Sequence, residues 1–446
     1  MQTNLAPEFR NTPDGAEAEA ILRKCVHCGF CTATCPTYQL LGDELDGPRG
    51  RIYLIKQVLE GAPPTRSTQI HLDRCLTCRN CETTCPSGVQ YGNLVEIGRR
   101  LVDERVERPA GEKAARVALK EGLTSPLFAP AMKVGQWFRP LLPKVLKNKI
   151  PVAADASAQR WPTREHPRKV LLLLGCVQPA MMPNINSATA RVLDAAGIQT
   201  LVAAGAGCCG AIRLHLNDHP GAHADMRRNI DAWWPLVEGL GGRTPVEAIV
   251  MNASGCGVTV KEYAHALAND PVYAGKAQRI AALTRDLSEL LPDMVPALRA
   301  RLAPADAAAG RDAGPPSALP RPAGERGGGA PLQPPAGRMK RIAFHPPCTL
   351  QHGQQLRGTV ESSLHALGFE IEIARTEGHL CCGSAGTYSV LQPELAYALR
   401  DRKLASLGDL QPQTIVSANI GCIQHLQTGT TTPVRHWVEV LDDALS

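Results

Sequence analysis

The sequence is poor in aromatic residues and has no long apolar run. Aromatic residues make up 4% of the 446-residue chain, and the longest apolar stretch, residues 170–174, is far too short to cross a bilayer. Residues 2–19 are mostly polar, so we expect no secretory signal. The net charge of +6 is a mild excess, and no nucleic-acid recognition motif accompanies it. We therefore expect no nucleic-acid partner.

Cysteine, by contrast, is abundant. The chain contains 16 cysteines. Without an export signal, so many cysteines indicate a reducing compartment and metal ligation rather than disulfide bonds, and we expect a cytoplasmic location. Hydrophobic residues make up 44% of the chain, which is enough for buried cores, and the length favours about three domains.

Two cysteine runs of identical spacing lie near the N-terminus. Residues 25–36 and 75–86 both have the pattern C-x2-C-x2-C-x3-C-P, which is typical of ferredoxin-type [4Fe-4S] sites. Three closely spaced thiolates can hold three corners of one cubane, and the fourth cysteine binds the neighbouring cluster. We therefore predict one cluster on Cys25, Cys28, Cys31 and Cys85, and a second on Cys75, Cys78, Cys81 and Cys35.

Disulfide bonds or zinc explain these runs less well. Cysteines three residues apart seldom form good disulfides, and zinc sites usually combine two distant pairs of ligands. Apolar residues at helical spacing predict helices over 52–59 and 91–106, so residues 1–110 read as a helical two-cluster domain. Arg49 and Arg51 lie between the runs, where they would either offset cluster charge or sit in a surface turn.

An internal repeat follows, with one copy over residues 169–291 and another over 340–445. Each copy alternates predicted strands and helices, carries a Cys-Cys-Gly motif and ends a later strand at a cysteine. This alternation predicts βαβ units around a parallel sheet. The cysteines that follow the strands should meet at one sheet edge; they are Cys176, Cys208, Cys209 and Cys256 in copy 1, and Cys348, Cys381, Cys382 and Cys422 in copy 2.

No cofactor fingerprint other than cysteine is convincing. Residues 205–210 match G-x-G-x-x-G after a strand, but residues 378–383 of copy 2 keep only the Cys-Cys-Gly part. The repeated feature is therefore the cysteine pair, and we expect no flavin on this chain. We also find no catalytic constellation of base and nucleophile.

Two further segments connect these parts. Residues 111–168 are predicted to be partly helical; between positions 133 and 169 they hold nine Lys or Arg and two acidic residues, together with Trp137 and Phe138. Such a segment could rest on a membrane surface, dock a partner or serve as a basic linker. Residues 303–338, rich in Ala, Pro and Gly, are predicted to be a disordered linker between domains 169–302 and 339–446.

The repeats resemble the CCG (cysteine-rich) domains of heterodisulfide reductases and of iron–sulfur subunits of 2-hydroxyacid oxidases. The pattern of that family ends in C-x-x-C, whereas Thr259 and His425 stand at the last position here. His425 is either a substitute ligand or a structural residue. Four soft ligands per copy suit an additional iron–sulfur or zinc site.

The whole plan resembles the iron–sulfur subunits of bacterial glycolate oxidases. The two cysteine runs, residues 48–56 between them and the Cys-Cys-Gly pairs carry the resemblance. It implies an α+β multidomain chain, with a helical dicluster domain before two tandem α/β CCG repeats. It also implies FAD-bearing partner subunits that oxidise the hydroxyacid, so this chain is an oxidoreductase subunit that relays electrons to a quinone or another carrier. A peripheral position on the inner face of the inner membrane would fit that role.

Other functions share parts of this plan. Iron–sulfur subunits of lactate-utilisation systems and of anaerobic glycerol-3-phosphate dehydrogenase resemble it as well. A thiol–disulfide enzyme of the heterodisulfide reductase type is a further alternative, although both copies lack the fifth cysteine. A metal-stabilised scaffold that binds flavoprotein subunits without transferring electrons is the third.

Overall fold

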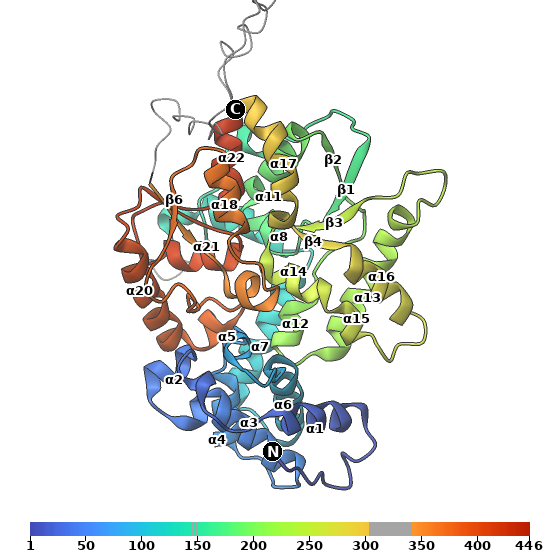
Figure 1. Cartoon of the computed structure of the whole chain (residues 1–446), viewed down its shortest axis with the longest axis vertical. Coiled ribbons are helices and arrows are strands. Elements are labelled where there is room, and N and C mark those ends of the chain that lie inside the picture. The colour runs from blue at the N-terminus through green and yellow to red at the C-terminus, as the bar shows by residue number, and fades with distance from the viewer. Residues whose placement is uncertain (144–146, 148–149, 303–340) are drawn as a thin grey trace, which may run out of the picture.

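The computed structural model describes residues 1–143, 147, 150–302 and 341–446. A helical N-terminal module lies below two α/β units that stand side by side (Figure 1). This arrangement confirms the predicted fold class. Within the described residues, no helix combines the length and the apolar character needed to span a bilayer. The predicted linker over 303–338 lies outside the described residues, and the domain boundaries stay a prediction.

Short helices capped by proline and threonine build the N-terminal module. Thr12 caps the first helix by accepting a hydrogen bond from Gly15 N, and Thr65 forms a capping box with Thr68. Helices α3 and α6 pack closely because Gly98 lies against Ile55. The elements are α1 (Pro13–Lys24), η1 (Phe30–Thr32), α2 (Pro36–Leu41), η2 (Glu44–Asp46), α3 (Pro48–Leu59), α4 (Arg66–Asp73), α5 (Asn80–Thr84) and α6 (Tyr91–Arg105).

The intervening basic segment is more helical than its sequence pattern suggested. Arg116 pairs with Asp73 of the N-terminal module, which holds the first of its helices in place. The Trp137 and Leu141 side chains are 78% and 81% exposed. The elements are α7 (Ala110–Thr124), α8 (Phe128–Trp137), η3 (Arg139–Leu141) and η4 (Ser157–Gln159).

Copy 1 is a four-stranded parallel sheet with strand order β2-β1-β3-β4. Helices precede and follow its strands, as the alternating pattern predicted. The elements are β1 (Arg168–Leu172), α10 (Gln178–Met181), α11 (Pro183–Ala195), β2 (Ile198–Leu201), α12 (Ala211–His215), α13 (His219–Val237), β3 (Ala248–Met251), α14 (Ser254–Lys261), α15 (Tyr263–Ala266), α16 (Ala274–Leu283), β4 (Thr284–Asp286) and α17 (Leu287–Leu302).

Copy 2 repeats this topology in the order β6-β5-β7-β8. A single π-helical turn, η7, follows its first strand. The elements are β5 (Ile342–His345), η7 (Thr349–Gly353), α18 (Thr359–Ala366), β6 (Ile371–Ile373), α19 (Tyr388–Leu391), α20 (Pro393–Gly408), β7 (Thr414–Ser417), α21 (Ile420–Gln427), β8 (Val434–His436) and α22 (Trp437–Leu445).

The two copies share one hydrophobic core. Helix α11 packs against α22, and α17 packs against α18, so buried residues of both sheets form one cluster. The loops after β3 and β7 also meet, because Ser254 N donates to Ala418 O at 3.0 Å and Ser254 Oγ lies 2.7 Å from Thr349 Oγ1. The cysteine-bearing ends of both sheets are therefore held against each other.

Candidate metal centres

The two N-terminal cysteine loops share their left-handed turn positions. His27 and Thr77, at matching positions, have φ of 58° and 52°, and Gly29 and Arg79 have φ of 84° and 60°. Such left-handed residues turn the chain tightly around the sulfur atoms. One consequence is visible at Cys75, whose Sγ accepts a hydrogen bond from Thr77 N at 3.3 Å. Identical spacing is accompanied by the same left-handed positions in both loops.

The eight N-terminal cysteines lie in two neighbouring groups. Cys25, Cys28, Cys31 and Cys85 line one small cavity, together with Cys81. Cys35 lies with the other run, where it interacts electrostatically with both Cys78 and Cys81. Burial, reinforced by neighbouring thiols, raises the pKa of Cys78 and of Cys81. Which cysteine binds which cluster stays a prediction.

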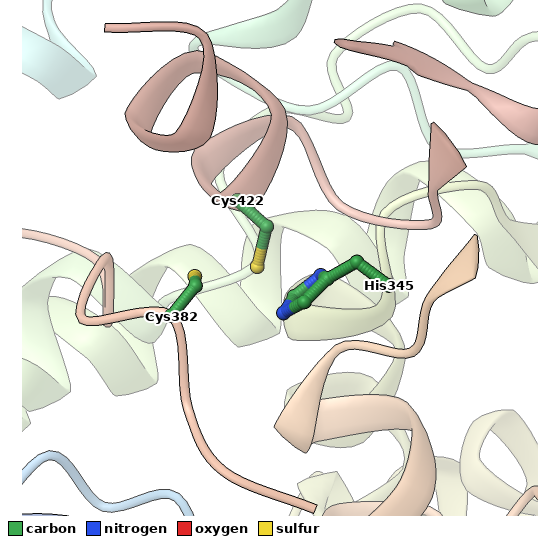
Figure 2. A group of neighbouring side chains, drawn as sticks. All are labelled: His345, Cys382 and Cys422. Carbon is green, nitrogen blue, oxygen red and sulfur yellow. The ribbon is translucent and has the colours of Figure 1, made fainter. Parts of the chain in front are cut away.

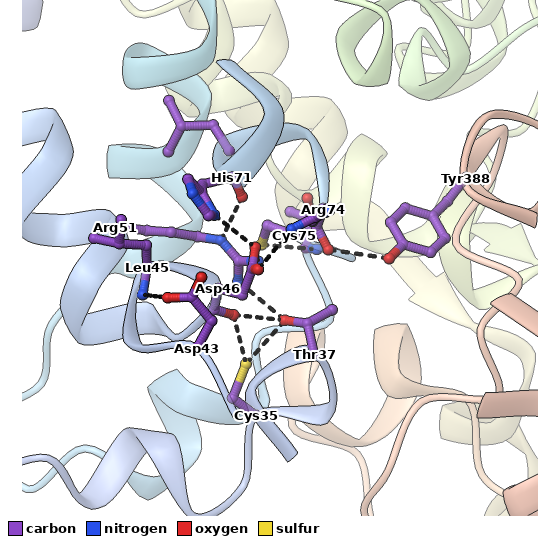
Figure 3. A network of polar contacts seen from close by, with 12 residues as sticks. Cys35, Thr37, Asp43, Leu45, Asp46, Arg51, His71, Arg74, Cys75 and Tyr388 are labelled. Atoms are coloured by element: carbon purple, nitrogen blue, oxygen red, sulfur yellow. Dashed lines mark hydrogen bonds and ion pairs between the residues drawn. The ribbon is translucent and has the colours of Figure 1, made fainter. Parts of the chain in front are cut away.

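Two arginines, the buried Arg51 and the half-buried Arg99, lie close to the second group. Burial by itself raises the pKa of Cys75, but the Arg51 and Arg99 guanidinium groups outweigh it and bring that pKa below its usual value. The thiolate is the form that binds metal. Arg51 is 1% exposed, and its Nε donates to His71 O at 2.7 Å in the polar network that Figure 3 shows beside Cys35 and Cys75. Arg51 therefore lies at the second cysteine group. Arg49 lines the cavity of the first group and pairs there with Glu44.

A large cavity lies where the three parts of the chain meet. Its volume is about 610 Å³, and apolar side chains from α7 and α8 form part of its wall. Cysteines of all three parts reach it: Cys78 from the N-terminal module, Cys176, Cys208, Cys209 and Cys256 from copy 1, and Cys348, Cys381 and Cys422 from copy 2. The expected convergence at the carboxyl ends of the strands is present in both copies.

Within each copy the thiols contact one another. In copy 1, hydrogen bonds from Cys176 and Cys209 lower the pKa of Cys208. In copy 2, the Sγ atoms of Cys348 and Cys381 are 3.8 Å apart. Clustered soft donors of this kind fit iron–sulfur or zinc.

At the position of the missing fifth cysteine, both copies carry a side chain that contacts a backbone carbonyl. Thr259 Oγ1 donates to Gly255 O at 3.0 Å, and His425 Nε2 lies 3.0 Å from Ala396 O. The structure thus places His425 on a backbone carbonyl. Another histidine, His345, lies beside Cys382 and Cys422 instead (Figure 2). Sequence reasoning missed it, although a polar residue ending the otherwise apolar strand Ile342–His345 was a usable signal.

The second N-terminal cysteine group docks directly on copy 2. Leu76 and Cys78 pack in one cluster with Cys348 and Cys381. Around it, Tyr388 Oη donates to Arg74 O at 3.1 Å, and Asn80 Nδ2 donates to His379 O at 3.3 Å. Cysteine groups far apart in the sequence are therefore neighbours in space.

Comparison with known proteins follows the same division of the chain. Residues 21–89 match the 4Fe-4S dicluster domain family, and residues 170–261 and 342–427 each match the cysteine-rich (CCG) domain family. The chain is 50% identical over 447 residues to the glycolate oxidase iron–sulfur subunit of Escherichia coli (strain K12), covering 100% of this chain and 99% of that protein. This chain belongs to the glycolate oxidase iron–sulfur subunit family.

More distant relatives match all or part of the chain. The probable glycolate oxidase iron–sulfur subunit of Bacillus subtilis (strain 168) is 27% identical over 95% of this chain and 91% of its own length. The lactate utilization protein A of Bacillus velezensis is 24% identical over 61% of this chain and 99% of its own length. As a member of the glycolate oxidase iron–sulfur subunit family, the chain is a subunit of an oxidoreductase, and the predicted dicluster and CCG domains are confirmed.

Proposed function

We propose that this chain relays electrons within a flavin-dependent 2-hydroxyacid oxidase whose substrate is glycolate. FAD-bearing partner subunits oxidise the substrate, and this chain carries the electrons to a quinone-type acceptor. The observation that supports this proposal most strongly is the contact between the second N-terminal cysteine group and the copy 2 thiols, through Cys78, Cys348 and Cys381. It places the second N-terminal group directly against the copy 2 thiols.

Two [4Fe-4S] clusters on the eight N-terminal cysteines would supply the one-electron steps that a reduced flavin needs to pass its electrons on. The chain's own residues set the conditions. Arg51 and Arg99 favour the thiolate form of Cys75, and the Thr77 amide donates to its sulfur. Burial of Cys75 and Cys81 keeps water away from the second cysteine group, and this exclusion of water tunes the reduction potential of the cluster that the group would hold.

The two ends of the proposed electron path differ in exposure, which suggests a direction. Cys28 is exposed, and the apolar side chains of Val26 and Phe30 beside it are 68% and 60% exposed. An exposed apolar edge next to the first cluster suits docking of the flavoprotein partner. The opposite end reaches the apolar cavity of about 610 Å³, a size that suits a quinone ring.

The exposed apolar side chains at the end of α8 and in η3 suit a position at the membrane surface. Trp137 and Leu141 project from a basic segment that also forms part of the cavity wall. Aromatic and apolar side chains among basic residues are typical of interfacial anchors. We therefore propose peripheral attachment at the inner face of the inner membrane, where a quinone would enter.

Lactate is the alternative substrate, favoured by the similarity to lactate utilization protein A. The substrate depends on the flavoprotein partners, so co-purification of the complex and mass spectrometry of its subunits decide between the two acids. A thiol–disulfide enzyme fits less well, because Thr259 and His425 bond to backbone carbonyls where a fifth thiol would be needed.

The test of the relay is Cys78→Ser in the assembled complex. Substrate should still reduce the flavin at the wild-type rate, whereas acceptor reduction should fall at least ~100-fold, because the link between the N-terminal module and copy 2 loses a ligand. Stopped-flow absorption follows both steps. Thr83→Ser, a conservative change in the same docked region, is the control and should leave both rates unchanged. Equal loss of flavin and acceptor reduction in Cys78→Ser would contradict the relay.

A further inference from the structure

A buried polar pair distinguishes copy 2 from copy 1. His345 ends β5 opposite Ser417 at the end of β7. In copy 1, Leu172 pairs with Val250, so the next residues, Leu173 and Met251, occupy the matching positions. Both are apolar and nearly fully buried. The carboxyl ends of the two central strands thus carry hydrophobic side chains in copy 1, but an imidazole and a hydroxyl in copy 2.

Hydrogen bonding assigns the tautomer of His345. The Ser417 hydroxyl donates to the backbone oxygen of His345 at 3.0 Å. Ser417 Oγ also lies 3.0 Å from Nδ1 of the His345 imidazole. Since a hydroxyl has one proton to donate, Ser417 Oγ must accept from Nδ1–H. Nε2 is therefore left with its lone pair free, which is the form that binds a metal.

That nitrogen is buried and has no hydrogen-bond partner. His345 is 1% exposed, and its Nε2 makes no hydrogen bond within the described structure. An unsatisfied buried acceptor is costly, so a position of this kind calls for a ligand. The ligand atoms of His345, Cys382 and Cys422 all lie within 4.8 Å of one another, and Figure 2 shows the imidazole directed at the two sulfurs.

The charge around the copy 2 thiols points in the same direction. Lys403 is 2% exposed, interacts electrostatically with Cys381 and Cys382, and donates to Glu377 O at 2.5 Å. The glycine of each Cys-Cys-Gly motif packs against a helix carbonyl, Ala396 O in copy 2 and Ala222 O in copy 1. Seven residues after these carbonyls stand Lys403 in copy 2 and the neutral Asn229 in copy 1, so these two positions correspond. A buried cation next to thiols is expected where those thiols are ionised by metal binding.

We propose that His345 Nε2 is a ligand of an iron–sulfur centre held in copy 2 by Cys348, Cys381, Cys382 and Cys422. Five donors exceed the four that a structural zinc takes, and copy 1 has no counterpart to the imidazole. The choice of iron over zinc also rests on the proposed electron-transfer function. The assignment of His345 Nε2 as a ligand does not depend on that function. A neutral imidazole in place of a thiolate raises the reduction potential of an iron–sulfur centre, which would make copy 2 an electron acceptor for the N-terminal clusters.

The experiment uses anaerobically purified full-length chain and the variants His345→Ala, His345→Cys and His425→Ala. Iron, zinc and labile sulfide are measured per chain, and pulsed EPR detects hyperfine coupling to a directly bound nitrogen. The wild type should hold more than the ~8 iron atoms of two cubanes and should show nitrogen coupling. His345→Ala should lose the copy 2 iron. His345→Cys should keep the iron, lose the nitrogen coupling and have a lower reduction potential.

The control His425→Ala should retain both the iron and the nitrogen coupling. Ser417→Ala, which removes the partner of Nδ1 and the hydrogen bond to His345 O but keeps the imidazole, tests the proposal even if His345→Ala fails to fold. It should speed iron loss to a chelator by ~10- to 100-fold. Nitrogen coupling that is absent from the wild type, or that persists in His345→Cys, overturns the ligand assignment, and zinc in copy 2 overturns the choice of iron. Because no readout uses glycolate, these failures are distinct from failure of the relay in Cys78→Ser.

Discussion

Replacement of Asp46 by Asn tests whether a buried ion network holds the second cysteine group in place. The Asp46 carboxylate is fully buried and accepts from Arg74 at 2.9 Å and from Arg51 at 3.4 Å, and it lies 3.1 Å from His71 Nδ1 (Figure 3). Its backbone oxygen also accepts from Thr37, whose hydroxyl lies 3.3 Å from Cys35 Sγ. The network therefore connects directly to a predicted cluster ligand.

The expected cost follows from what Arg51 retains. Breaking a buried ion pair by removing one charge costs about 3–5 kcal/mol, because the remaining charge is left uncompensated. Arg51 keeps its hydrogen bonds to His71 O at 2.7 Å and to Thr37 Oγ1 at 3.1 Å. We therefore expect the lower end of that range, about 3 kcal/mol, which is roughly a 12–24 °C shift for a unit of about 100 residues.

Thermal unfolding of the anaerobic full-length chain, followed by the visible absorption of the clusters, measures this shift. Iron release to a chelator should also speed up at the second cysteine group. Glu44→Gln is the matched control: its partner is Arg49, with side-chain exposures of 40% and 37%, and exposed pairs contribute less than about 1 kcal/mol. Adding Arg51→Met to Asp46→Asn should recover much of the loss, because no fully buried unpaired charge remains; Arg74, the other arginine partner of Asp46, is 33% exposed to water.

A free energy of unfolding of Asp46→Asn within about 0.5 kcal/mol of that of the Glu44→Gln control would contradict this prediction. A double variant that is less stable than the single one would contradict it as well. Either result would mean that the guanidinium of Arg51 is stabilised mainly by its neutral partners, His71 O and Thr37 Oγ1, rather than by the carboxylate.

Two further outcomes are expected. The 2.9 Å hydrogen bond between His265 and Glu17 raises the pKa of His265 above 6.5 and lowers the pKa of Glu17 below 4.5. The stability that this contact contributes is therefore full between about pH 4.5 and 6.5. It declines as the pH rises through the His265 pKa or falls through the Glu17 pKa. Because His265 is 55% exposed, the effect is below about 1 kcal/mol. Glu17→Gln should flatten the dependence of the melting temperature on pH, and an unchanged profile would exclude this contact as its source. The double variant Trp137→Ser, Leu141→Ser should float with anionic liposomes at least ~10-fold less than the control Val117→Ser, because interfacial binding scales with the apolar area inserted. Equal flotation of the two variants would rule out the segment formed by α8 and η3 as the anchor.

Local spacing determined much of this protein before any tertiary contact was known. A cubane requires thiolates at fixed intervals along one tight loop, so residues 25–36 and 75–86 predict their chemistry by themselves. The same holds for the alternating strands and helices of the repeats, which dictate parallel sheets with cysteines at one edge. The helix α7 was only partly anticipated, because its residues pack mainly through ion pairs such as Arg116 with Asp73 rather than through an apolar stripe.

Tertiary structure alone decided which distant groups meet. His425 matched the missing ligand by sequence position, yet its imidazole lies on Ala396 O, whereas His345 reaches the thiols through the register of β5 with β7. The contact of Cys78 with Cys348 likewise joins residues hundreds of positions apart. Spacing along a chain specifies ligands within one loop, but the choice among ligands from different strands depends on long-range packing that no local pattern records.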